Sequence, residues 1–223
     1  MRKVFSLGAL LMLAMCTGFV CSCNDDVEET PPATVTPPGG DATEDKDTHE
    51  YVDLGLPSGT LWATCNVGAD KPEDFGNYYA WGERRTKKIF DIDTYSIYFK
   101  KDNSISGNRS HDVARKKWGA TWRIPTVENF EELDSLCVWT WGMRNGTDGY
   151  IVTAANGNSI FLPAAGACVK DSVYSVREEG YYWSATPNAI DTNLSYFLFF
   201  NRSYAIIYDY FRVVGLTVRP VTE

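Results

Sequence analysis

A sharp change in composition near residue 50 most constrains how this chain of 223 residues can fold. Residues 24–49 contain eight acidic residues, one lysine and four prolines, with almost nothing that could enter a hydrophobic core. Such a segment buries too little apolar surface to offset the entropy lost on ordering. The sequence therefore predicts one folded domain at 50–223, whose 174 residues suit a single core.

The first residues have the pattern of a bacterial export signal. Arg2 and Lys3 precede an apolar stretch at 4–20, and small Ser22 comes directly before Cys23. A small residue at that place suits a peptidase that must accommodate the side chain preceding a cysteine. We therefore expect a lipoprotein signal whose removal leaves a lipidated Cys23 as the first residue.

Other interpretations of this start are weaker. Cysteine is a poor residue at an ordinary secretory cleavage site, and the apolar stretch is shorter than the roughly 20 residues of a membrane-spanning helix. Cys16 and Cys21 are rival lipid acceptors, but bulkier residues precede them. The predicted organisation is a lipoprotein signal peptide at 1–22, a lipidated cysteine with a disordered acidic and proline-rich linker at 23–49, and a domain at 50–223.

The expected partner of Cys23 is membrane lipid, because the two or three acyl chains of a lipoprotein cysteine anchor a protein stably whereas one chain does so only marginally. The acidic run at 24–29 resembles the signal that directs lipoproteins of the Bacteroidota to the outer face of the outer membrane. Alternatively, these carboxylates begin a solvated tether. We expect a location at the outer membrane, lipid-anchored and facing the cell exterior.

The charge balance argues against nucleic acid as a partner. Without Arg2 and Lys3 the chain has 19 basic and 29 acidic residues. The domain alone has 18 basic and 21 acidic residues, so most of the acidity belongs to the tether. A protein that binds nucleic acid would normally carry the opposite excess.

The domain shows two helical signals. Residues 110–119 have Ser110 as a cap, an early acid, late basic residues and a closing glycine. Residues 125–137 have Thr126 as a cap and apolar residues on one face. We expect short helices at both places.

After the second helix the apolar period changes to two, which indicates strands. The residues at 156–158, Asn-Gly-Asn, are a hairpin signal because glycine and asparagine tolerate positive φ. The predicted strands are 150–154, 159–162, 181–185, 194–200, 204–210 and 216–218. Two short helices with a bent, mainly antiparallel sheet predict an α+β fold class.

Several long motifs in order resemble the Fibrobacter succinogenes major paralogous domain. They are YVDLGLPSGTLWATCNVGA at 51–69, GNYYAWGE at 76–83, WRIPT at 122–126, NGNSIFLPAAG at 156–166, YWSAT at 182–186 and GLTVRPV at 215–221. That family is abundant in surface lipoproteins and has no reaction generally assigned to it. The resemblance implies a domain with a C-type-lectin-like fold, similar to the formylglycine-generating-enzyme-like fold.

The residues do not supply the chemistry known for such folds. A lectin calcium site would need Glu-Pro-Asn, but Thr186 replaces the carboxylate here. The last cysteine is Cys168, so the late cysteine pair of the formylglycine-generating enzyme is missing, and only His49 and His111 are available for a nucleophilic triad. No zinc motif occurs. We expect no catalytic residue, no metal site and no cofactor.

Most aromatic residues of the motifs are expected in the core. This applies to Trp62, Trp81, Trp122 and Trp183, while Arg123 and Arg219 are read as structural arginines. In the pairs Trp139/Trp141 and Tyr181/Tyr182 we expect the rings on opposite strand faces, with one of each pair exposed.

The domain has three cysteines, and spacing alone leaves all three pairings open. Export to an oxidising compartment favours a disulfide. We expect it between Cys65 and Cys137, which lie in segments rich in family motifs, and we expect Cys168 to be a free buried thiol.

Ligand recognition is expected in the loops at 187–193 and 201–203, because C-type-lectin-like folds commonly use this part of the chain. The loops are polar and lie outside the shared motifs, as functional loops on a rigid scaffold often do. The candidate ligand-binding residues are Asn188, Asp191, Asn193 and Arg202. Alternatively, these are solvated turns without a partner.

The sequence thus predicts a cell-envelope lipoprotein that displays a non-catalytic binding or structural module. The expected roles are adhesion and the recognition of a glycan or protein ligand. Two alternatives stay open: an enzyme of extracellular glycan or protein modification, and a subunit of a fimbria-like assembly.

Overall fold

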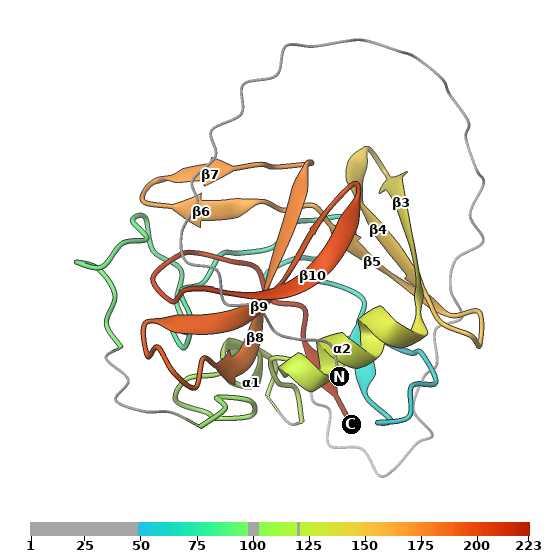
Figure 1. Ribbon diagram of the computed structural model, residues 1–223, viewed down its shortest axis with the longest axis horizontal. Coiled ribbons are helices and arrows are strands. Elements are labelled where there is room, and N and C mark those ends of the chain that lie inside the picture. The colour runs from blue at the N-terminus through green and yellow to red at the C-terminus, as the bar shows by residue number, and fades with distance from the viewer. Residues whose placement is uncertain (1–48, 98–102, 120) are drawn as a thin grey trace.

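The computed structural model of the protein describes residues 49–97, 103–119 and 121–223 (Figure 1). The predicted signal peptide, Cys23 and the predicted linker up to residue 48 lie outside the described residues. Within the described ranges, none of the helices has the length and apolar character needed to cross a bilayer.

Strands dominate the described part of the chain. The two helices are α1 (Val113–Trp118) and α2 (Val127–Leu136). The strands are β1 (Tyr51–Asp53), β2 (Leu61–Ala63), β3 (Val138–Arg144), β4 (Thr147–Thr153), β5 (Ser159–Pro163), β6 (Ala167–Val169), β7 (Ser172–Tyr174), β8 (Glu179–Pro187), β9 (Leu194–Asn201), β10 (Tyr204–Phe211) and β11 (Val221–Thr222).

These strands form four small antiparallel sheets. The orders are β1-β2-β11, β10-β9-β8, β3-β4-β5 and β6-β7. The expected α+β, C-type-lectin-like domain with one bent sheet is therefore wrong, and the fold is mainly β. The helices contribute only six and ten residues. The strands β1, β2 and β11 are two or three residues long, which is too short for a periodic signal, and β11 pairs with β2 from the far end of the sequence.

Helix α1 begins at Val113 rather than near Ser110, because Asp112 and not the serine caps it. The buried carboxylate of Asp112 accepts hydrogen bonds from the backbone N–H groups of Gly107, Ile124 and Arg115 at 2.7, 2.9 and 3.0 Å. Burial raises the pKa of Asp112, because the charged carboxylate loses hydration. The hydrogen bonds from these N–H groups lower the pKa, but the effect of burial is larger. One side chain thus ties together the loop before α1, the helix itself and the chain after it.

Helix α2 matches the prediction, with Thr126 as its N-cap. The buried side chain of Asn129 accepts from the Thr126 N–H at 3.0 Å and donates to the Thr60 hydroxyl at 3.1 Å. On the exposed side of the helix, Glu132 accepts from the N–H and hydroxyl of Ser58. These bonds attach α2 to the loop that precedes β2.

The predicted hairpin at 156–158 is confirmed and joins β4 to β5. Gly157 has φ +87°, a conformation that side chains with a Cβ rarely adopt, and the Ala154 N–H donates to the Asn158 carbonyl at 2.9 Å. Local turn chemistry is enough to explain this element.

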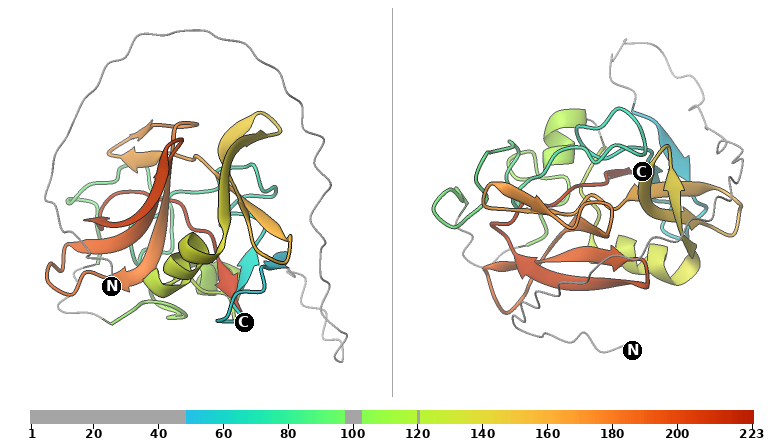
Figure 2. Two further views of the ribbon diagram at one scale, coloured as in Figure 1. Left: turned by 45° about the vertical axis from the view of Figure 1, so that its right-hand side comes forward. Right: turned by 90° about the horizontal axis from the view of Figure 1, so that it is seen from above.

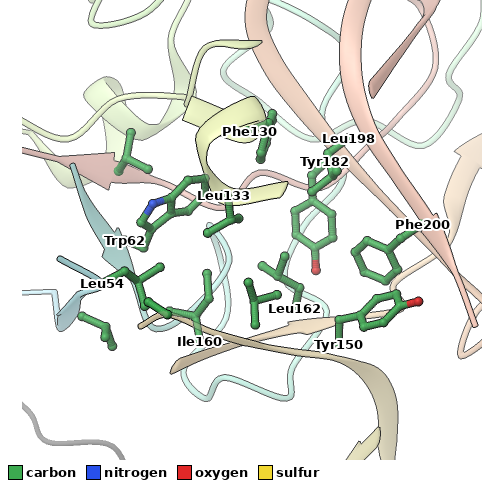
Figure 3. Close-up of a cluster of buried hydrophobic side chains, with 14 of the residues drawn as sticks. Leu54, Trp62, Phe130, Leu133, Tyr150, Ile160, Leu162, Tyr182, Leu198 and Phe200 are labelled. Carbon is green, nitrogen blue, oxygen red and sulfur yellow. The ribbon is translucent and has the colours of Figure 1, made fainter. Parts of the chain in front are cut away.

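The β8-β9-β10 sheet separates two hydrophobic clusters. Residues that alternate along each strand point to opposite faces. Tyr182, Leu198 and Phe200 enter one cluster, together with Trp62, Phe130, Leu133 and Leu162 (Figure 3). Trp183, Phe197 and Phe199 enter the other, together with Trp81, Ile124 and Leu216. Helix α2 packs against this sheet on the side that faces β3-β4-β5 (Figure 2).

The four tryptophans expected in the core are buried. Tyr181 and Tyr182 lie on opposite faces, as expected, but neither ring is exposed, because Tyr181 packs against the second cluster and Tyr182 is buried in the first. The expectation for Trp139 and Trp141 is wrong. Two residues apart on β3, they share one face and both pack at right-angle geometries against Tyr150, at 5.3 and 5.2 Å between ring centroids. Neither ring is fully exposed.

Arg219 is a structural arginine, as the sequence predicts. Its guanidinium donates to Asn66 Oδ1 and to the carbonyls of Ala63, Thr64 and Phe161 at 2.8, 3.0, 2.6 and 2.9 Å. Burial lowers its pKa, because the charged form loses hydration. Arg123 is half-buried and donates to Asn129 Oδ1 at 2.8 Å. The predicted strand at 216–218 forms isolated bridges instead of a ladder.

Candidate functional site

The structure does not bring the four predicted ligand-binding residues together. Asn188, Asp191 and Asn193 lie before the start of β9, and Arg202 lies in the turn after its end. A strand of eight residues separates its ends by roughly 23 Å. One small ligand cannot contact both groups.

The three residues before β9 build their own loop. Asn188 Oδ1 accepts from the N–H groups of Ile190 and Asp191 at 2.7 and 2.9 Å, and its amide donates to Asp209. Asp191 Oδ1 accepts from the N–H and the amide of Asn193, both at 2.9 Å. Their polar atoms are therefore occupied in shaping the turn, in the way that Asn and Asp commonly do.

The expected disulfide is not formed. Among the described cysteines, Cys65, Cys137 and Cys168 are all free thiols. Cys65 follows β2 beside Thr64, whereas Cys137 caps the end of α2 and packs against the first core cluster. Burial raises the pKa of Cys137 to about 11 and also raises the pKa values of the other two, so none is an activated thiolate.

Within the described ranges, no three His, Cys, Asp or Glu side chains are grouped closely enough to hold a metal ion. The two histidines lie on the surface formed by the loops between β2 and α2. His111 lines one depression of that surface and His49 lines another.

These two depressions are neighbours that share three lining residues, and we call them together the cationic groove. Their volumes are about 590 and 500 Å³, and both are lined by Arg84, Arg85 and Lys116. The first continues past Glu83, Lys87, Thr94, Ser96, Ser110 and His111. The second continues past Gly68, Lys117, Trp118 and His49. The green loops that carry most of this groove lie away from β3-β4-β5 (Figure 2).

The loop at 83–97 is held by single hydrogen bonds to the rest of the domain rather than by a sheet. Phe90 and Lys170 exchange two bonds, from each N–H to the other carbonyl, at 2.8 and 2.9 Å. The hydroxyl of Tyr95 donates to the carbonyl of Trp81 at 2.9 Å inside the domain. The loop is therefore fixed at its middle and at its end.

Inside the groove, one ion pair fixes the wall. Lys87 Nζ lies 2.8 Å from Glu83 Oε2, and Glu83 Oε1 accepts from the N–H and hydroxyl of Ser96 at 2.9 Å. Arg84 donates to the carbonyl of Arg109 at 2.9 Å, which joins this loop to the one before α1. The Glu83 charge is thus balanced by Lys87, and the arginines add a net positive charge.

The opposite wall comes from the last turn of α1. Lys116 and Lys117 are exposed there, next to the half-buried Trp118. Basic residues near a helix C-terminus also interact favourably with the helix dipole, which explains why α1 tolerates them. Among the described residues, no ion pair includes Arg85, Lys116 or Lys117. Their charges are directed to solvent.

An aromatic stack closes one end of the groove. The rings of His49 and Trp118 are stacked with centroids 3.7 Å apart and 16° between their planes. Trp118 in turn meets the buried Trp122 edge to face at 5.0 Å. The stack is anchored to the core through Trp122.

Sequence reasoning missed this site, although a signal was present. Residues 84–117 contain ten of the 21 basic residues of the chain and only four acidic residues. Charge summed over the whole domain conceals this segment, because residues 118–223 have seven basic and eleven acidic residues. A local charge profile would have found it.

Two further depressions are smaller. One of about 420 Å³ contains the predicted residue Arg202, beside Trp141, Asp148, Arg177, Glu178 and Glu179. The other, of about 280 Å³, is mostly apolar and includes Asn193, Ile92 and Phe211. Charges of both signs mix in the first, so it has no net field comparable to the cationic groove.

Comparison with known proteins adds one family. A family model described as "Domain of unknown function (DUF8237)" matches residues 143–221, about a third of the chain. No curated protein matches, and no solved structure matches. The matched residues cover β4 to β11, whereas the cationic groove lies before them in the sequence.

Proposed function

We propose that this chain is a cell-envelope lipoprotein whose domain, of the Fibrobacter succinogenes major paralogous type, is a non-catalytic binding module for an extracellular ligand. The observation that carries the proposal is the cationic groove. Exposed cations on a hydrogen-bonded frame, with a stacked aromatic pair beside them, provide a surface suited to recognition.

Support for the anchor comes from the sequence. Ser22 and Cys23 form the processing pattern, and an acidic, proline-rich composition follows at 24–49, as expected of a tether between a lipid anchor and a domain. Mass spectrometry of the intact protein from the membrane fraction should find an acylated Cys23 as the first residue. An unmodified N-terminus at any other residue would contradict the anchor.

Binding is tested with the full-length protein in neutral detergent, screened against immobilised glycans and extracellular proteins. We expect a bound ligand that is recovered chemically unchanged, and reduced binding in the variant Lys116→Gln/Lys117→Gln. The matched control is Lys71→Gln/Lys170→Gln, which removes the same charge from exposed positions elsewhere.

The outcomes separate the alternatives. Equal loss in both variants would show a nonspecific charge effect and contradict a site in the groove. Conversion of the ligand to a new product would replace the binding module with an enzyme of glycan or protein modification.

A second candidate function is a subunit of a fimbria-like assembly, and the edge of the β10-β9-β8 sheet favours it. Strand β10 pairs with β9 on one side only, and Tyr204, Ile206 and Tyr208 are exposed along it. No lysine or proline within β10 blocks strand addition. Concentration-dependent polymers of the full-length protein in sedimentation experiments would support this role, provided that Ile206→Lys abolishes them.

A further inference from the structure

We infer that the cationic groove binds an acidic polysaccharide, a glycan chain that carries carboxylate or sulfate groups. This inference rests on the proposed function and names the class of ligand. Three features of the groove support it: its charge, its length and its aromatic end.

The charge of the groove is complementary to an anion. Arg85, Lys116 and Lys117 project into solvent without an ion pair among the described residues. Arg84 uses one nitrogen for the Arg109 carbonyl and keeps further donors in its guanidinium. Exposed cations without an ion pair have no internal salt bridge to break when a ligand carboxylate or sulfate arrives, and several of them can act on one chain together.

The length of the groove fits a chain better than a single small anion. The two depressions share Arg84, Arg85 and Lys116 at their junction, while Lys87 lines only the first and Lys117 only the second, so basic residues line both depressions. Each depression has a volume within the range of about 300–1,000 Å³ that ordinary ligand sites have. A polymer that repeats its charge along its length can occupy both.

The two ends of the groove offer contacts that a sugar uses. At one end Thr94, Ser96 and Ser110 contribute hydroxyl groups. At the other end His49 and the half-buried Trp118 line the depression with aromatic side chains, a residue type that packs against the nonpolar face of a pyranose ring. Together with the cations, these residues match a ligand that is acidic, hydroxylated and ring-shaped.

Nucleic acid shares the negative charge but fits the rest of the protein less well. Outside residues 84–117 the domain has eight basic and 17 acidic residues. A long duplex extending from the groove would meet a surface with more acidic than basic residues. Duplex DNA is therefore included as a competitor in the test.

The experiment measures binding of full-length protein, in neutral detergent at 50 mM salt (about a 14 Å screening length), to heparin, polygalacturonate and dextran. Heparin supplies sulfate, polygalacturonate supplies carboxylate, and dextran is neutral. We expect at least one acidic chain to bind about tenfold or more tightly than dextran. Lys116→Gln/Lys117→Gln should weaken that binding at least about fivefold, as two exposed charge contacts would, and Lys71→Gln/Lys170→Gln should not.

Trp118→Ala tests the aromatic end, with its thermal midpoint as a check of folding. We expect weaker binding to the acidic glycan with an unchanged dependence on salt, because an apolar contact is lost and no charge is. Lys116→Gln/Lys117→Gln should instead make the salt dependence shallower.

Several results would overturn the inference. Equal binding of dextran, equal weakening by the control variant, or tighter binding of duplex DNA would each exclude an acidic glycan as the ligand. If no polysaccharide binds and a protein ligand depends on Lys116 and Lys117, the proposed function stands and the inference about glycans fails.

Discussion

The loop-built region at 64–126 and the sheet-built region at 127–222 reach order by different means. In the sheet-built region, ladders such as β8-β9-β10 satisfy the backbone and apolar side chains fill both faces. In the loop-built region, side chains such as Asp112 satisfy backbone groups instead. The difference shows that a charged surface can be held rigid without a sheet, provided that buried polar residues bond the loops.

The two regions also differ in charge. Residues 84–117 have ten basic and four acidic residues, whereas residues 118–223 have seven and eleven. The family match at 143–221 falls within the sheet-built region. The sheet-built region and the cationic groove therefore come from separate parts of the sequence, so a substitution can change one without changing the other.

The largest effect on stability is expected in the sheet-built region. Phe200 is fully buried between Tyr150 and Tyr182, at 5.3 and 5.8 Å between ring centroids. Phe200→Ala should lower the free energy of unfolding by about 3–5 kcal/mol, because it leaves a cavity in the core. Phe211→Ala, at a half-exposed ring of β10, is the control and should cost far less. Urea unfolding measures both, and equal losses would contradict the assignment of Phe200 to the core.

The next effect is expected in the loops. Asp112→Ala should lower the free energy of unfolding by about 2–3 kcal/mol, because three N–H groups, that of Ile124 buried, lose their acceptor and α1 loses its cap. Asp112→Asn should lose less, since one oxygen can still cap α1. Hydrogen exchange should show faster exchange at Gly107 and Ile124. Unchanged exchange there would mean that the loops do not depend on this carboxylate.

The smallest effect tests the contact between the regions. Tyr182 donates to the Pro163 carbonyl at 2.7 Å and accepts from Asn66, which lies in the loop-built region. Burial raises the pKa of Tyr182 to about 12. Above pH 10 the unfolded tyrosine ionises while the folded one keeps its proton, so stability must fall as the pH rises from 10 to 12.

This group alone should cost about 2 kcal/mol over that interval. Thermal midpoints measured from pH 8 to 12 test it, with Tyr182→Phe as the control. The phenylalanine variant should begin less stable and lose less over the interval. Parallel curves for the two proteins would contradict the pKa shift of Tyr182.

The elements that the sequence predicted well are those with local causes. Helix α2 follows from Thr126 and its apolar face, and the β4-β5 hairpin follows from Gly157. The α+β class failed because β1, β2 and β11 are too short to show a period and because β11 pairs with β2 from far away in the chain. The excess of basic residues at 84–117 was visible in the sequence, but only folding places Lys116 and Arg85 on one groove.

The sequence by itself determined that the motif tryptophans would be buried and that the chain would turn at Gly157, because hydrophobicity and φ preference act residue by residue. It predicted Trp62 and Arg219 as interior residues, and the structure confirms both. Only the tertiary structure decided which polar side chains form internal hydrogen bonds and which ones face solvent. Asn188 and Asp191 bond their own loop while Lys116 and Lys117 stay open to solvent, and that choice depends on which backbone groups folding leaves nearby.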